Sequence, residues 1–359
     1  MFPASNLPAS QMAIVQDSDG KPTLIHNASV PGLDSGTLLV KTFAVALNPS
    51  DYKMGLAFTQ PGAVMGGDFA GHIVAIDPKA QAMRPNLRVG DAVCGIVHGS
   101  NPRDHESGSF AEFVRVLAHL VLRIPSDMSM VDAATLGCTL LTSCIALWDV
   151  LNITATPECV AKTPVPVLVY GGSTACGTMA VQLLHLSGLE PIATCSPRNF
   201  DLVRSFGATA VYDYTVPDVG HTIKKDTNGR LRHALDCISD QQSTQCCYAS
   251  LGRPAGHVAS LEILQADWKS RDVIKHDFVM CLEGMGKELA LEGEYKRPAS
   301  SEKCKLAARM FPIFQRLLDE RILKTHPVEV VGHGLNSIID GLGVLQSGLV
   351  SGKKLVILL

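Results

Sequence analysis

The stretch that decides the fold is VLVYGGSTACG, which runs from Val167 to Gly177. A short β-branched run leads into small residues, and residues 178–187 then follow with helical spacing. Small residues at such a turn let a pyrophosphate approach the backbone closely, at a helix N-terminus whose N–H groups and dipole favour anions. The stretch therefore indicates a dinucleotide site, although Thr174 and Ala175 replace glycines of the usual pattern. A tight strand-to-helix turn without a ligand is the alternative.

Strands and helices alternate on the C-terminal side of this stretch. Because the apolar runs are short and are separated by helical segments, they predict a parallel, doubly wound sheet. The expected strands are 165–170, 191–195, 210–212, 234–238 and 257–261, and the expected helices are 178–187 and 200–206.

The N-terminal third has a different pattern, in which Gly and Pro punctuate short apolar runs. Strands are expected at 38–47, 71–76, 91–97 and 110–116, and they predict a barrel-like β domain. Helical spacing begins at about residue 131 and continues to 151.

The C-terminal part begins with a polar segment, 282–303, that is expected to be a loop excursion. Residues 304–322 are expected to be helical, and 353–359 to form a strand that returns to the first domain. The fold class is therefore α/β, with a β-rich domain (1–150 and 305–359) and a dinucleotide-binding domain (151–304).

Composition limits the class of protein. At 359 residues two domains are the default expectation, and 46% apolar residues can build sizeable cores. The formal charge of -3 and the scattered Lys and Arg residues argue against a nucleic-acid partner.

Membrane and export signals are not expected either. The first ten residues lack a basic segment followed by an apolar stretch, and the nearly uncharged run Ala133–Trp148 is shorter than the roughly 20 residues that span a bilayer. We interpret that run as a buried helix. Eleven cysteines, an odd number without a C-x-x-C pair, favour free thiols in the cytoplasm, and the adjacent Cys246 and Cys247 are interpreted as structural.

The residues after the second strand of the alternating region indicate which dinucleotide is bound. NAD-binding proteins usually carry an Asp or Glu there, which accepts hydrogen bonds from the ribose 2′-OH. Here 191–195 is followed by Ser196-Pro197-Arg198-Asn199, which contains no carboxylate. A hydroxyl and a guanidinium suit a 2′-phosphate, so NADPH is predicted. The alternative is that Arg198 is only a solvated residue at a helix start.

Several segments together resemble the medium-chain dehydrogenase/reductase superfamily. They are 48–51 (NPSD), 66–71 (GGDFAG), 89–93 (VGDAV), 108–112 (GSFAE) and the nucleotide loop. This resemblance implies a GroES-like catalytic domain built from both chain ends and a Rossmann domain between them.

Zinc alcohol dehydrogenases of that superfamily place Gly-His-Glu where this chain has Gly66-Gly67-Asp68, and four cysteines in the segment that is here 98–105. Without that His and those cysteines neither zinc site can be assembled in the usual way. No metal is therefore expected, and His72, His98 and His105 are interpreted as ordinary strand or loop residues.

A closer resemblance is to the trans-acting enoyl reductases of fungal polyketide synthases. It rests on 170–175, 192–197, 199–202, 235–238, 351–352 and Tyr295-x-Arg297-Pro298, and it is thinner across 262–290. It implies hydride transfer from NADPH to the β-carbon of an α,β-unsaturated polyketide thioester. The carrier would be an acyl carrier protein of a partner polyketide synthase, alone or in a hybrid with a peptide synthetase.

The same resemblance implies the residues of the site. Tyr52 has a hydroxyl that is neutral at pH 7 and can donate a proton, and Lys53 can donate to the ribose or orient a proton source. The alternatives are a solvated loop lysine for Lys53, a core residue for Thr142 and a surface aromatic for Tyr214. The implied catalytic residues are Lys53, Tyr52 and Thr142; the cofactor contacts are Ser50, Asp51, Ser173, Thr174, Ala175, Cys176, Ser196, Pro197, Arg198, Asn199, Tyr214, Leu261 and Ser351; the substrate contacts are Ser143, Cys281 and Leu282.

Two other functions stay open at this point. Zinc-free relatives include free-standing quinone or enone reductases, which use the same cofactor on small molecules. A protein that binds NADPH without turnover, of the lens-crystallin kind, is the third reading.

Overall fold

The computed structural model describes residues 7–359. These residues form two compact units, one made of 7–141 with 282–359 and the other of 142–281. The sequence analysis placed the domain boundaries after residues 150 and 304. Both boundaries fall earlier in the chain, after 141 and after 281. The second differs more because the excursion packs on the first unit: the Tyr295 ring lies 5.2 Å from that of Phe58, and Arg103 forms an ion pair with Glu288 at 2.7 Å.

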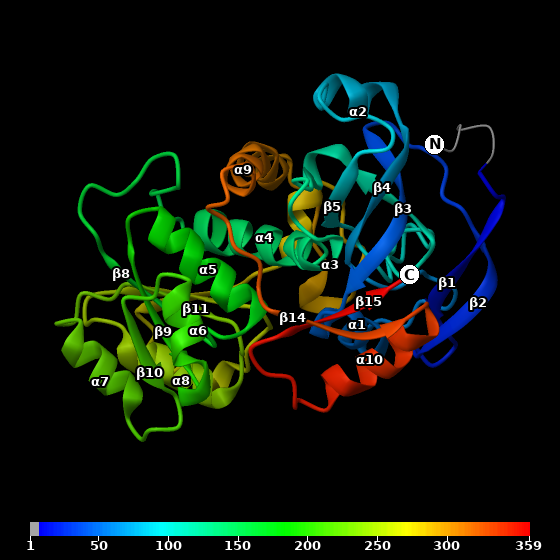
Figure 1. Cartoon of the computed structure of the whole chain (residues 1–359). Helices are drawn as coiled ribbons and strands as arrows, with labels where there is room; N and C mark the ends of the chain where they lie inside the picture. Colours follow the sequence, from blue (N-terminus) through cyan, green and yellow to red (C-terminus); the bar gives the residue numbers. More distant parts are fainter. Residues whose placement is uncertain (1–6) are drawn as a thin grey trace. The chain divides into compact units, whose positions relative to one another are not determined.

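The first unit contains a seven-stranded sheet and a two-stranded β1–β2 sheet (Figure 1). The sheet order is β14-β15-β3-β4-β5-β7, and β6 pairs with β3. All four strands expected in the N-terminal third are present. The bounds are β1 (Ser10–Gln16), β2 (Pro22–Ser29), β3 (Thr37–Ala46), β4 (Asp68–Ile76), β5 (Ala92–Ile96), β6 (Phe113–Leu117), β7 (Val121–Arg123), β14 (Val328–His333) and β15 (Lys354–Leu358).

The last strand joins the two ends of the chain. β15 pairs antiparallel with β3, with Val356 opposite Ala46, and parallel with β14. The expected return of 353–359 to the first domain is therefore confirmed. Buried side chains of β3, β4, β15 and α10 form one apolar core, in which Phe69, Val45 and Ile357 are each 0% exposed.

Helices of the first unit connect and cover these strands. Their bounds are α1 (Pro49–Ala57), α2 (Pro78–Met83), α3 (Met130–Ala133), α9 (Ser301–Asp319) and α10 (Asn336–Gln346), with short helical turns η2 (Ala118–Leu120), η6 (Cys281–Met285, whose first residue belongs to the second unit) and η7 (Gly293–Tyr295). The helix expected at 304–322 is confirmed as α9.

The second unit is a six-stranded, fully parallel sheet with the order β10-β9-β8-β11-β12-β13. The parallel, doubly wound sheet predicted from the alternating pattern is therefore confirmed. The bounds are β8 (Pro166–Tyr170), α5 (Ala175–Leu186), β9 (Glu190–Cys195), η4 (Pro197–Asn199), α6 (Phe200–Ser205), β10 (Ala210–Asp213), α7 (Val219–Asp226), β11 (His233–Asp236), α8 (Gln241–Ser250), β12 (Gly256–Ser260), η5 (Ala266–Trp268) and β13 (Ile274–Phe278).

One helical stretch of the described residues, Met130–Val150, is long and apolar enough to cross a membrane by length and composition. It comprises α3, α4 (Leu136–Cys144) and the π-helical η3 (Ile145–Val150). Because 78% of its apolar window is buried inside the protein, the stretch has the surroundings of a core helix, as predicted for 133–148.

Candidate functional site

The glycine-rich turn of the second unit has the geometry of an anion-binding loop. Gly171 follows β8 with φ +77°, and Thr174 caps α5: its Oγ1 accepts from the Gly177 N–H at 2.9 Å and donates to the Gly171 carbonyl at 2.8 Å. A Cβ at Gly177 would lie 2.2 Å from that carbonyl oxygen, so only glycine fits there. The turn is therefore drawn tightly against the helix start.

The predicted phosphate contacts Ser173, Thr174, Ala175 and Cys176 lie together on this turn, and all four are half-buried. They precede or begin a helix of 12 residues, whose first N–H groups have no intrahelical partners. The turn thus presents accessible backbone at a helix N-terminus. These residues fit the pyrophosphate of a dinucleotide.

The end of β9 carries the groups predicted to bind a 2′-phosphate. The Ser196 Oγ lies 3.3 Å from the Tyr214 hydroxyl, and the exposed Arg198 guanidinium makes no hydrogen bond or ion pair among residues 7–359. Asp213, at the end of the adjacent strand β10, does not pair with Arg198. Its carboxylate accepts hydrogen bonds from the Thr215 N–H and hydroxyl. The Ser196 and Tyr214 hydroxyls therefore lie together beyond the ends of β9 and β10. The Arg198 guanidinium, in the same turn as Ser196, has no partner among the described residues. Pro197 is exposed and Asn199 is buried in η4.

Tyr214 is also fixed by its neighbours. Its ring centroid lies 6.2 Å from that of Tyr170, and its carbonyl accepts from the Gln242 side chain at 3.1 Å. The structure thus brings Ser196 and Tyr214 together, which the sequence separates by 18 positions.

Other predicted residues of the second unit lie on separate elements. Leu261 directly follows β12, and its N–H donates to the Asp236 carbonyl and the Ser239 Oγ at 3.1 and 3.0 Å. Cys281, which begins η6, is half-buried.

Thr142 and Ser143 are adjacent on α4, with 6% and 0% exposure. The Ser143 Oγ is buried and has no hydrogen-bond partner within the described part of the chain. An unsatisfied buried hydroxyl is unfavourable unless something else binds it, so Ser143 is suited to receive a ligand atom.

In the first unit, α1 carries four predicted residues. Ser50 and Lys53 are exposed, Tyr52 is half-buried, and Asp51 is buried with 6% exposure. The Asn48 N–H donates to the Asp51 carboxylate at 2.7 Å, which fixes the first turn of the helix.

Burial raises the pKa of Asp51 to about 7, and the nearby negative charge of Asp68 acts in the same direction. Hydrogen bonds from backbone N–H groups of Asn48 and Gly67, together with the Lys354 charge, lower this pKa but do not offset the burial. Asp51 therefore changes its charge near neutral pH.

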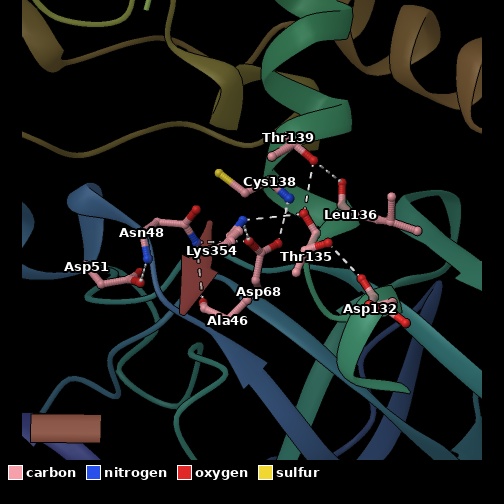
Figure 2. A network of polar contacts seen from close by, with 10 residues as sticks. All are labelled: Ala46, Asn48, Asp51, Asp68, Asp132, Thr135, Leu136, Cys138, Thr139 and Lys354. Carbon is pink, nitrogen blue, oxygen red and sulfur yellow. Dashed lines mark hydrogen bonds and ion pairs between the residues drawn. The ribbon is translucent and has the colours of Figure 1, made fainter. Parts of the chain in front are cut away.

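Asp68 and Lys354 form a buried ion pair, with Nζ to Oδ2 at 2.6 Å (Figure 2). The same Asp68 oxygen accepts from the Asn48 side-chain amide at 2.9 Å, and Oδ1 accepts from the Cys138 N–H at 2.6 Å. Lys354 also donates to the Thr135 carbonyl at 3.4 Å. Four segments of the first unit thus meet at one carboxylate.

Asp68 stands where zinc alcohol dehydrogenases of the resembled superfamily have the Glu of Gly-His-Glu, and its two oxygens are bound by protein donors. Residues 7–359 contain no group of three or more His, Cys, Asp or Glu side chains that could hold a metal ion. His98 is buried, and its pKa is lowered by burial to about 4, so it is neutral at pH 7. His72 and His105 are exposed.

Ser351 and Leu282 complete the predicted set. Ser351 is half-buried and lies three residues before β15, and Leu282 is half-buried within η6.

The sequence analysis did not select Lys354. One signal for it existed, because a charged residue at the start of the apolar run LVILL must find a buried partner.

The fold and these sites define a two-domain enzyme class, the medium-chain dehydrogenases/reductases, which bind a nicotinamide cofactor in the Rossmann unit. Residues 34–126 match the alcohol dehydrogenase GroES-like domain family, and residues 175–273 match the zinc-binding dehydrogenase family. An alcohol dehydrogenase superfamily protein from Novosphingobium aromaticivorans has the same fold, with a TM-score of 0.76, 21% identity, and coverage of 98% of this chain and 100% of that one. The CurK enoyl reductase is similar, with a TM-score of 0.72, 20% identity, and coverage of 97% and 99%.

Sequence relatives define the family more narrowly. The chain is 45% identical to the trans-enoyl reductase TwmE of Talaromyces wortmannii, over 96% of each chain. It is 44% identical to the trans-enoyl reductase poxP of Penicillium oxalicum, over 99% of this chain and 94% of the other. The chain therefore belongs to the trans-enoyl reductase family, a group of oxidoreductases, as the resemblance predicted.

Proposed function

We propose that this chain is a trans-acting enoyl reductase. It transfers hydride from NADPH to the β-carbon of an α,β-unsaturated polyketide thioester held on an acyl carrier protein of a partner polyketide synthase, alone or in a hybrid with a peptide synthetase. The observation that carries the proposal is identity above 40% to proteins named trans-enoyl reductases, over nearly the whole chain.

Bound NADPH supplies the hydride, and the thioester carbonyl makes the β-carbon electron-poor. The chain's own residues hold the reactants in near-attack geometry, which is worth several powers of ten in rate. In this assignment Ser50, Asp51 and Lys53 of α1 serve the nicotinamide ribose, and Ser351 and Leu261 are further cofactor contacts.

Negative charge moves to the thioester oxygen as hydride adds, and donors near that oxygen stabilise it. Thr142 and Ser143 are assigned this role on α4. The support for Ser143 is its buried hydroxyl without a partner among the described residues. Cys281 and Leu282 are assigned to the acyl chain.

The α-carbon must receive a proton after hydride transfer. Tyr52 is assigned as donor because a phenol hydroxyl can donate a proton and this one is half-buried rather than fully enclosed. Lys53 is assigned to orient the proton source or to bind the ribose.

The preference for NADPH rests on the end of β9. Arg198 is exposed and uncommitted among the described residues, and the Ser196 and Tyr214 hydroxyls lie 3.3 Å apart beside it. Arg binds phosphate through charge-assisted, bidentate hydrogen bonds. None of the eleven cysteines forms a disulfide, which fits the reducing cytoplasm proposed as the location.

One assay tests the reaction. NADPH oxidation is followed with crotonyl and tiglyl pantetheine thioesters, with the same acyl groups on an acyl carrier protein, and with a free quinone. Turnover of the thioesters, faster on the carrier, is expected. Turnover of quinone alone contradicts the proposal, and tight NADPH binding without any turnover would favour a non-catalytic, crystallin-like protein.

A further inference from the structure

The Asp68–Lys354 pair is a deeply buried ionic contact of the first unit. Its side chains are 0% and 3% exposed, so neither reaches a ligand on the protein surface. Taking two charges out of water is unfavourable, and an apolar pair of similar volume is often as stable or more stable. A contribution to the stability of the fold therefore does not by itself explain why these two positions hold an ion pair.

What distinguishes Asp68 is the identity of its partners. Asn48, which donates its side-chain amide at 2.9 Å, directly precedes α1 and caps it. Cys138, which donates its N–H at 2.6 Å, lies in the first turn of α4. One carboxylate thus binds the starts of two helices at once (Figure 2).

These two helices carry the residues assigned above to the reaction. Tyr52 and Lys53 lie in the first turns of α1, and Thr142 lies four residues, about one helical turn, beyond Cys138. The Asp68 charge also favours the N-terminus of α4, where the helix dipole is positive. Lys354 neutralises this charge from the start of β15, three residues after Ser351.

We propose that Asp68, with Lys354 as its charge partner, is a positioning residue for hydride transfer, which fixes the start of α1 and the start of α4 on one carboxylate. The proposal rests on the enoyl reductase function argued above. Misplacement of a reacting group by about 1 Å can reduce a rate about 100-fold, so loss of this link is expected to lower kcat although neither side chain touches substrate.

The test uses the double variant Asp68→Asn/Lys354→Met. Single substitutions would leave one buried charge without a partner and are expected to unfold the protein, whereas the double variant is neutral and keeps the volumes. The control is Asp104→Asn/Arg115→Met, which removes the Asp104–Arg115 ion pair of the same unit, at 2.8 Å, together with the weaker contacts of Arg115 to Asp34 and Glu106 at 3.4 and 3.8 Å. None of these touches either helix start.

Three readouts are measured on the full-length protein: kcat and KM with the enoyl thioester, NADPH affinity by fluorescence, and amide hydrogen exchange. For the Asp68/Lys354 variant we expect kcat to fall about 10- to 100-fold, with KM and NADPH affinity changed less than about threefold. Exchange at 50–53 and 136–139 is expected to be at least about tenfold faster, because the first turns of both helices open more often once the Asp68 carboxylate no longer binds the Asn48 side chain and the Cys138 N–H. The control should keep its kcat within about twofold.

A folded double variant with kcat within about twofold of the parent would overturn the proposal. So would a loss of kcat accompanied by loss of NADPH binding and a lowered melting temperature, since that pattern indicates only a structural role. If the parent protein itself fails to reduce the thioester, the proposed function is wrong. In that case, amide hydrogen exchange at the starts of α1 and α4, compared between the parent and the double variant, still shows whether Asp68 fixes the two helix starts.

Discussion

The Tyr214 hydroxyl lies 3.3 Å from the Ser196 Oγ, which joins the end of β10 to the turn after β9. Tyr214 is held from two other directions, by the Tyr170 ring and by the Gln242 side chain. The two hydroxyls therefore form a fixed polar surface in the second unit, whereas Arg198, two residues after Ser196, is exposed and uncommitted among the described residues. This combination leads to the first prediction.

Arg198→Ala is expected to weaken NADPH binding about 10- to 100-fold, because a hydrogen bond to a charged group contributes about 1.5–3 kcal/mol. NADH binding should change little, since NADH has no 2′-phosphate. Fluorescence titration with both dinucleotides measures the two affinities.

The matched control is Arg230→Ala. Arg230 is another exposed arginine of the second unit, and it pairs with Glu190 at the opposite end of β9 at 3.3 Å. Its loss should leave both affinities within about twofold, as expected for a surface ion pair. Equal weakening of NADPH and NADH by Arg198→Ala would remove Arg198 from the 2′-phosphate site.

Asp51 gives a pH dependence of stability. Its pKa in the folded protein, about 7, is above the ordinary value of 3.8, so the folded state binds more protons than the unfolded state between these values. The resulting stabilisation of the folded state is fully present below about pH 4 and is lost as the pH rises through about 7. Its size is about 1.4 kcal/mol for each unit by which the pKa of Asp51 is raised.

Asp51→Asn keeps an oxygen that can accept from the Asn48 N–H but cannot ionise. Its free energy of unfolding, from urea titrations at pH 5 to 8.5, should therefore fall less steeply with rising pH than that of the parent protein. Parallel curves for the two proteins would show that Asp51 does not titrate in this range.

The excursion after η6 gives a third prediction. The Tyr295 ring lies 5.2 Å from the Phe58 ring in an edge-to-face arrangement, at the C-terminal end of α1. In a double-mutant cycle of Phe58→Ala and Tyr295→Ala, the coupling energy should be about 0.5–1.5 kcal/mol of unfolding free energy. Additive effects of the two substitutions would indicate that the rings do not stabilise each other.

Local patterns predicted most of the fold. The stretch Val167–Gly177 carries its own strand, turn and helix start, so its structure follows from neighbouring residues. Helix α8 (Gln241–Ser250) has no apolar periodicity, so the local pattern does not set its bounds. Its start depends on Asp240, whose carboxylate accepts from the Ser243 N–H at 2.7 Å, and on the packing of Cys247 and Tyr248 in the core.

The site was predictable only in part for a similar reason. The proposed phosphate loop and the turn at 196–199 are each contiguous in sequence, so residue types alone indicate the chemistry expected of them. Lys354 and Asp68 are 286 positions apart, and nothing local to either identifies its partner. Their pairing depends on β15 returning beside β3, which brings the two ends of the chain into one sheet.

The last prediction compares two glycines in helices. A Cβ at Gly177 would lie 2.2 Å from the Gly171 carbonyl oxygen and 2.9 Å from the Thr174 Oγ1, so Gly177→Ala must displace the turn. Overpacking of this kind reduces stability by about 1–3 kcal/mol, and NADPH binding should weaken at least about tenfold because the displaced backbone is the proposed phosphate cradle. Gly343, in α10, has nothing within 4 Å of the added Cβ, so Gly343→Ala should raise stability by about 1 kcal/mol and leave NADPH binding unchanged. Urea unfolding and fluorescence titration of both variants measure the difference, and NADPH binding by Gly177→Ala with the parent affinity would mean that the turn does not hold the pyrophosphate.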